Sequence, residues 1–206
     1  MNRAEFLDAV RDENQTELSR LGSSKSLYAL TGGEMDENDV YAVVQTLAGE
    51  LAATFESWSG DADGALATAL SAAVETERER AADAAEETDA DTDAEGGLYD
   101  ALDGLKSPVE RAAGLVAATL VGKKVQEQLV GFFVGQADPT TASTFRDYGG
   151  VLEDRREAAL DALESVVDGD DDWETAVETA ERVVGGAYEV YTDRLEAMGV
   201  NPKPVC

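Results

Sequence analysis

Apolar residues recur at intervals of three and four along nearly the whole chain, and no segment shows the strict alternation typical of a β-strand. This period predicts amphipathic helices, because residues three or four apart lie on one face of a helix. We therefore predict an all-α fold of about six long helices. The expected helices span residues 3–21, 38–58, 63–87, 107–135, 138–167 and 171–198, with a further short stretch at 27–30.

Short connections between these helices predict antiparallel packing, and we expect a single helical-bundle domain over residues 1–206. The segment Ser107-Pro108-Val109-Glu110 is a strong helix start, because it combines a capping box with proline at the first helical position. The apolar run 112–122 is too short to span a bilayer and predicts a buried core helix. Residues 87–97, which are mostly Asp, Glu, Thr and Gly, are typical of a flexible acidic linker.

Acidic residues dominate the charged positions: 44 Asp and Glu stand against 16 Lys and Arg, for a net charge of −28. At molar salt the Debye length falls to about 3 Å, so such a surface stays folded and soluble there. In dilute buffer the same surface repels itself. The composition indicates adaptation to a salty cytoplasm. It also argues against a nucleic-acid partner, because phosphate binding requires clustered Lys and Arg.

Two residue types that carry much of protein chemistry are scarce. The chain has no histidine, which removes the commonest general base, the Ser-His and Cys-His pairs and every His-containing metal site. Its single cysteine, Cys206, is the last residue, so disulfide frameworks and Cys-based zinc sites are excluded. The N-terminal residues contain no apolar signal segment. We expect a cytoplasmic protein that does not enter the membrane.

A few charged residues fall where the helical period places the core. In the helix 63–87, Glu77 lies in the middle of the apolar stripe and Arg80 follows one turn later. In the helix 138–167, Arg156 falls at the centre of the stripe and Glu153 on its flank. Two helices therefore each present Glu-x-x-Arg at or near the inward face.

An isolated buried charge is costly, so these groups should meet partners. We expect an inward charge network of all four residues, with Glu77 paired to Arg156 across the bundle. Two alternatives stay open. The helix could end near Val74, which would leave Glu77 exposed, or the charges could line a ligand pocket. Two further acids are candidates: Glu50 at the edge of an apolar face, and Glu127, which we expect to pair with Lys123 on the helix surface.

The Glu-x-x-Arg spacing matters because four-helix carboxylate proteins hold two iron ions with Glu-x-x-His on two helices and one Glu from each of two others. Arg80 and Arg156 stand where those motifs have histidine. Arginine stays cationic and cannot coordinate a metal. If the ancestry is shared, a salt-bridge network has replaced the metal.

Three segments resemble small acidic proteins of salt-loving archaea that are grouped with the rubrerythrin, or ferritin-like, family: ELSRLGSSKSLYALTGG at 17–33, VGFFVGQADP at 130–139 and MGVNPKPVC at 198–206. The resemblance implies a ferritin-like bundle and, in that family, peroxide-directed oxidoreduction at a di-iron centre. It carries over Glu77 and Glu153 as positions of former iron ligands. The rubredoxin-type iron site of rubrerythrins needs four cysteines, and this chain has one.

Together these features predict a salt-adapted, ferritin-like bundle without a working di-iron site, with a non-catalytic role as scaffold, sensor or adaptor. It would need no cofactor and would bind a protein partner or a second copy of itself. The alternative is a rubrerythrin-like oxidoreductase or iron-binding protein that uses carboxylates alone, with Glu77, Glu153, Glu50 and Glu127 as ligands. A third possibility is a bundle that holds an organic ligand in an apolar cavity.

Overall fold

The computed structural model describes residues 1–89 and 97–202. Within these ranges the regular structure consists of eight α-helices and one short 3-10 helix, η1 (Asp100–Leu102), and the prediction of an all-α fold is confirmed. Most of the expected acidic linker, 90–96, and Cys206 lie outside the described residues. The α-helices are α1 (Arg3–Glu13), α2 (Gln15–Leu21), α3 (Ser24–Leu30), α4 (Glu37–Ser59), α5 (Gly64–Glu86), α6 (Pro108–Gly135), α7 (Pro139–Val166) and α8 (Asp170–Ala197).

The described ranges hold eight helices where the sequence predicts about six long ones, and the difference lies near the N-terminus. The expected helix 3–21 is two helices, α1 and α2, which meet at Asn14. Asn14 has φ −106° and ψ 23°, and its buried side-chain amide donates to the Val10 carbonyl at 2.8 Å. A side chain that bonds to the preceding turn in this way competes with continued helix. The short stretch at 27–30 is part of α3.

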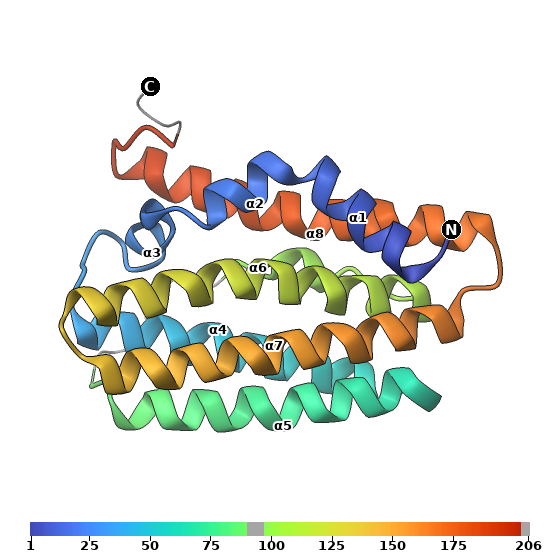
Figure 1. Ribbon diagram of the computed structural model, residues 1–206, viewed down its shortest axis with the longest axis horizontal. Helices are drawn as coiled ribbons and strands as arrows, with labels where there is room; N and C mark the ends of the chain where they lie inside the picture. Colours follow the sequence, from blue (N-terminus) through green and yellow to red (C-terminus); the bar gives the residue numbers. More distant parts are fainter. Residues whose placement is uncertain (90–96, 203–206) are drawn as a thin grey trace.

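The long helices α4 to α8 lie side by side along the long axis of the molecule (Figure 1). The largest contacts join α4 to α5 and α6 to α7, and α6 also packs on α8. The short helices α1, α2 and α3 lie against α8, with α2 and α3 reaching α6 as well. Helices α6 and α7 therefore have neighbours on several sides.

The helices do not all follow the antiparallel order that the sequence predicts, because one pair of consecutive helices is parallel. Helices α4 and α5 form an antiparallel pair, as do α6 and α7, but α5 and α6 run in the same direction (Figure 1). At one end of the bundle Thr88 donates to the Asn38 carbonyl at 3.0 Å, beside the start of α4. Toward the other end, Leu105 approaches Gly114 near Trp58. The end of α5 and the start of α6 therefore lie at opposite ends of the bundle.

The buried apolar side chains of the described residues form one continuous core to which all eight α-helices contribute. Helix α6 is central to it, because every residue from 112 to 121 is buried, which confirms the predicted core helix. The capping box is also confirmed: Ser107 Oγ accepts from the Glu110 N–H at 3.2 Å, and the Glu110 carboxylate accepts from the Ser107 N–H at 2.9 Å. Over the described ranges, no helix combines the length and the apolarity that crossing a bilayer requires.

Candidate functional site

Glu77 lies on the core-facing side of α5 and has no exposed surface. Leu70 and Val74 precede it on the same buried side, and Ala84 follows it two turns later. Helix α5 continues to Glu86, so the alternative in which it ends near Val74 is wrong. The core therefore contains a carboxylate whose burial requires partners.

Two donors reach this carboxylate from α7. Arg155 Nη1 donates to Glu77 Oε1 at 2.5 Å, and the Tyr148 hydroxyl donates to the same oxygen at 2.5 Å. Tyr148 and Arg155 are seven residues apart, so they lie on one face of α7, two turns from each other. The Arg155 side chain is only 6% exposed, which makes its pair with Glu77 a buried ion pair.

A second arginine completes the group from α5 itself. Arg80 Nη1 lies 3.6 Å from Glu77 Oε2, and the Arg80 guanidinium lies over the Tyr148 ring, 4.2 Å from its centroid. Arg80 Nη2 also donates to Gln126 Oε1 on α6 at 3.4 Å, while Gln126 Nε2 donates to the Phe145 carbonyl. We call Glu77, Arg80, Gln126, Tyr148 and Arg155 the Glu77 network. It links α5, α6 and α7.

The Glu77 network carries a local charge of +1, because two guanidiniums surround one carboxylate. Burial is the largest single influence and acts to lower the pKa of Arg155, but the contributions of Glu77 and Tyr148 together outweigh it and the pKa is raised, so Arg155 stays protonated. Burial raises the pKa of Tyr148, which keeps its hydroxyl a neutral donor. Glu77 Oε2, Arg80 Nε and Arg155 Nη2 are buried and make no hydrogen bond.

This arrangement favours an ion-pair network over a metal centre. A metal ligand must present a lone pair to the cation, whereas Glu77 Oε1 already accepts two hydrogen bonds and Oε2 faces a guanidinium. Among residues 1–89 and 97–202, no three His, Cys, Asp or Glu side chains lie close enough together to hold a metal ion. The chemistry available to the Glu77 network is charge pairing between α5 and α7, with a hydrogen bond from Arg80 to Gln126 of α6.

The predicted pairing of Glu77 with Arg156 is wrong, and Arg155 takes that place. Consecutive residues on a helix point about 100° apart, and α7 packs on α5, α6 and α1, so positions 155 and 156 face different neighbours. Arg156 Nη2 lies 3.5 Å from Glu157. Glu153 is exposed and accepts from Lys123 Nζ at 2.6 Å, a contact that lowers the Glu153 pKa. Of the four predicted residues, Glu77 and Arg80 come together, and Glu153 and Arg156 do not join them.

The two further candidate acids also lie apart from the Glu77 network. Glu50, half-buried on α4, accepts from the Gly97 N–H at 3.2 Å, and burial raises its pKa. Glu127 is exposed and pairs with Lys124 at 3.2 Å, so the expected pair with Lys123 is wrong. Lys123 turns instead to Glu153 on α7.

Sequence reasoning did not single out Tyr148, Arg155 or Gln126. The signal for the first two was present, since a tyrosine and an arginine seven residues apart flank the apolar stripe of α7 on one side. Gln126 stands among the polar residues of α6 after the apolar run 112–122, and only its helical spacing to the buried Leu129 and Phe133 marks it as inward-facing.

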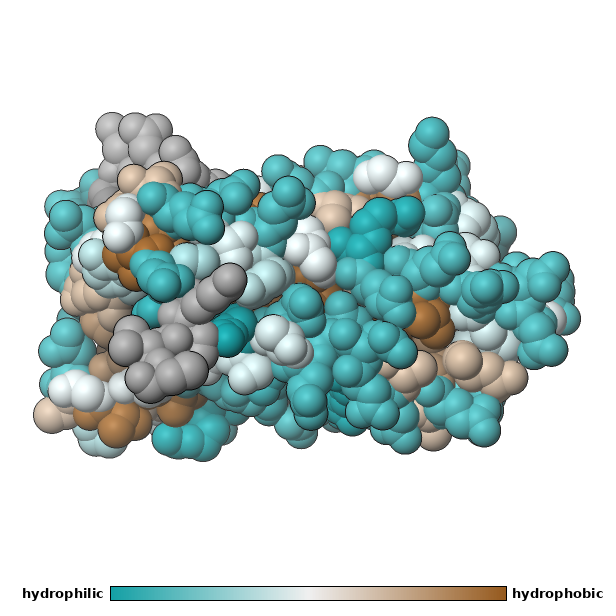
Figure 2. Space-filling view, turned by 90° about the horizontal axis from the view of Figure 1, so that it is seen from above, coloured by the Kyte–Doolittle hydropathy of each residue, from teal (hydrophilic) through white to brown (hydrophobic). Residues whose placement is uncertain are grey.

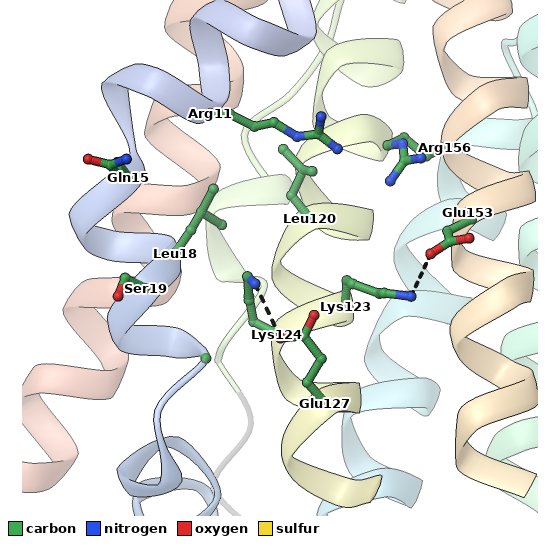
Figure 3. Close-up of a pocket in the computed structure, with 11 residues that line it drawn as sticks. Arg11, Gln15, Leu18, Ser19, Leu120, Lys123, Lys124, Glu127, Glu153 and Arg156 are labelled. Carbon is green, nitrogen blue, oxygen red and sulfur yellow. Dashed lines mark hydrogen bonds and ion pairs between the residues drawn. The ribbon is translucent and has the colours of Figure 1, made fainter. Parts of the chain in front are cut away.

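One surface cleft reaches the Glu77 network, and a second is lined by Glu153 and Arg156. A cleft of about 480 Å³ reaches Arg80 and Tyr148 from outside and has Tyr41 and Phe145 among its lining residues; its acidic members are Glu79, Asp83, Glu86 and Glu87. A second cleft, of about 620 Å³, lies between α1, α2, α6 and α7 and is lined by basic residues, among them Arg156 (Figure 3). The charge that sequence analysis placed at the core of α7 therefore lines a surface cleft.

Comparison with known proteins found no match to this chain among protein-family models, curated proteins or solved structures.

Proposed function

We propose that this chain is a non-catalytic helical-bundle protein, a scaffold, sensor or adaptor, of a ferritin-like type whose di-iron site has been replaced by charge pairing. One observation carries the proposal. Glu77, the fully buried carboxylate among the described residues, has its oxygens directed to Arg155, Tyr148 and Arg80. Arg80 occupies the position where the Glu-x-x-His motif of di-iron bundles has its histidine.

The chain connectivity supports the ferritin-like part of the proposal. Two antiparallel helix pairs, α4 with α5 and α6 with α7, follow each other along the chain, and the end of α5 and the start of α6 lie at opposite ends of the bundle (Figure 1). A single long crossover between antiparallel pairs is the connectivity of ferritin-like bundles. In this proposal α1, α2, α3 and α8 are additions, of which α2, α3 and α8 pack on α6 and α1 packs on α7 and α8.

The net charge of −28 supports a protein adapted to a salty cytoplasm. The proposed binding partner is another protein or a second copy of the chain. Nucleic acid is not proposed, because acidic residues outnumber basic ones 44 to 16 and would repel phosphates.

Iron content tests the proposal directly. The chain is produced in iron-rich medium and purified in molar KCl, and bound iron is measured by mass spectrometry alongside consumption of hydrogen peroxide. We expect iron far below one per chain and peroxide consumption equal to that of Glu77→Gln. About two irons per chain, as a di-iron site requires, with loss of that iron in Glu77→Gln but not in the exposed Glu75→Gln, would establish the oxidoreductase alternative instead.

A further inference from the structure

The second cleft reverses the charge of the molecule locally. It lies between the N-terminal helices and the α6–α7 pair and has a volume of about 620 Å³ (Figure 3). Four of the 16 basic residues of the chain line it: Arg11, Lys123, Lys124 and Arg156. Two carboxylates, Glu127 and Glu153, also line it, so four positive charges less two negative ones leave +2. We call it the basic cleft.

Within the basic cleft, the two lysines and not the two arginines form ion pairs with the lining carboxylates. Lys123 pairs with Glu153 and Lys124 with Glu127, and the charge of Arg156 also contributes to lowering the Glu153 pKa after that of Lys123. No carboxylate of the described residues lies within 4.0 Å of Arg11. Arg156 has one ion-pair contact, at 3.5 Å to its chain neighbour Glu157, and its buried Nε makes no hydrogen bond.

The two arginines extend into the same space from opposite walls. Arg11 comes from α1 and Arg156 from α7, and in Figure 3 their side chains point toward each other beside Leu120 of α6. Two cations that converge without an anion repel each other. The two acids that line the basic cleft, Glu127 and Glu153, form their ion pairs with the two lysines. The position between Arg11 and Arg156 is thus suited to an anion from outside the chain.

The shape and the lining narrow the class of ligand. A volume of about 620 Å³ lies in the range of small-molecule sites, about 300–1,000 Å³. Guanidinium groups bind the oxygens of phosphate by paired hydrogen bonds, and two of them match a doubly charged anion. Leu18 and Leu120 add an apolar surface beside them.

We propose that the basic cleft binds a small organic phosphate, with the phosphate between Arg11 and Arg156 and the organic part against Leu18 and Leu120. The proposal shares no residue with the Glu77 network and so stands whether or not the bundle has lost an iron site. It gives the non-catalytic protein a ligand to sense.

Calorimetric titration with inorganic phosphate and with adenosine monophosphate tests the proposal, at the lowest KCl concentration that keeps the circular dichroism spectrum of the folded chain. We expect saturable binding of one adenosine monophosphate per chain, tighter than that of inorganic phosphate. Arg156→Gln and Arg11→Gln should each weaken binding at least about tenfold, the effect of losing a charged hydrogen-bonding group. Arg11 is exposed, so its variant should keep the fold.

The matched control is Arg146→Gln, which removes the same charge from an exposed position on α7 outside the basic cleft. Equal weakening by Arg146→Gln, or no saturable binding of either probe, would overturn the proposal. Adenosine monophosphate that binds no more tightly than inorganic phosphate would overturn the organic part. A hexaglutamate peptide that binds more tightly than both would assign the basic cleft to an acidic protein segment instead.

Discussion

At the scale of single residues, the Glu77 network concentrates charge in an otherwise apolar interior. Glu77 is completely buried and Arg155 nearly so, while Arg80 is 14% exposed toward its cleft. Burying charges costs several kcal/mol per ion, and only close pairing with further hydrogen bonds offsets that cost. The network therefore depends on its one carboxylate, because Glu77 is the anion that both arginines face.

Replacement of that carboxylate is the sharpest test at this scale. Glu77→Gln should lower the free energy of unfolding by about 3–5 kcal/mol, the usual cost of removing one partner of a buried ion pair. The reason is that Arg80 and Arg155 would remain buried without a counter-charge. Urea unfolding at constant KCl, followed by circular dichroism, measures the change.

Two further variants keep this test specific. Glu75→Gln removes the same charge from an exposed position on α5 and should change the free energy of unfolding by less than about 0.5 kcal/mol. The double variant Glu77→Gln with Arg155→Met should be less destabilised than the sum of the two single variants, because it removes both members of the pair. A Glu77→Gln variant as stable as Glu75→Gln would contradict the buried ion pair.

The burial of Glu77 could be predicted from the sequence, but its partner Arg155 could not. Glu77 could be placed in the core because apolar residues precede and follow it at helical intervals along α5. The pattern put Arg156 at the centre of the stripe and gave no reason to choose Arg155, because α7 is buried on more than one side. A single-helix pattern gives the direction of a side chain relative to the stripe but does not say which neighbouring helix lies there.

At the scale of elements, local signals fixed some boundaries and missed others. The start of α6 could be read from Ser107 to Glu110, because capping is a contact within four residues. The break at Asn14 could not, since an asparagine inside an apolar period is compatible with a continuous helix. The direction of α6 relative to α5 depends on contacts at both ends of the bundle, which no local pattern contains.

The adjacent glycines of α8 give an element-scale prediction. A β-carbon added at Gly186 would lie 2.9 Å from Ala101 Cβ of η1, whereas one added at Gly185 meets nothing within 4 Å. Gly186→Ala should therefore lower the free energy of unfolding by about 1–3 kcal/mol, because it forces η1 away from α8.

Gly185→Ala serves as the matched control for this contact. It should leave the protein equally stable or up to about 1 kcal/mol more stable, since alanine favours helix more than glycine does. Urea unfolding of both variants under one buffer condition decides the point. The opposite order of stability would contradict the close packing of η1 on α8.

At the scale of the whole molecule, the charge and the core are separated in space. The face drawn in Figure 2 is covered mostly by hydrophilic residues, with small separate apolar areas between them. The apolar side chains of the described ranges meet in one core, and Glu77 is the buried acid within it. Most of the net charge of −28 therefore acts through the solvent and depends on salt.

Thermal unfolding in increasing KCl tests this dependence. Between about 0.15 M and about 2 M KCl the Debye length falls from about 8 Å to below about 3 Å, so repulsion between surface carboxylates weakens. We expect the midpoint temperature to rise by about 4–8 °C, equivalent to about 2 kcal/mol for a chain of this size. Sucrose at matched osmolality is the control for solvent exclusion. A midpoint temperature that does not change with KCl, or that rises equally in sucrose, would contradict adaptation to salt.

The position of α6 has a consequence for how the protein is made. Its ten successive buried residues, 112–121, are covered in part by α7 and α8, which lie later in the chain. During synthesis α6 therefore leaves the ribosome before much of its covering surface exists. The part of α6 that α8 covers stays open until α8, which ends at residue 197, has left the ribosome, and during this interval the growing chain is most exposed to aggregation and most dependent on chaperones.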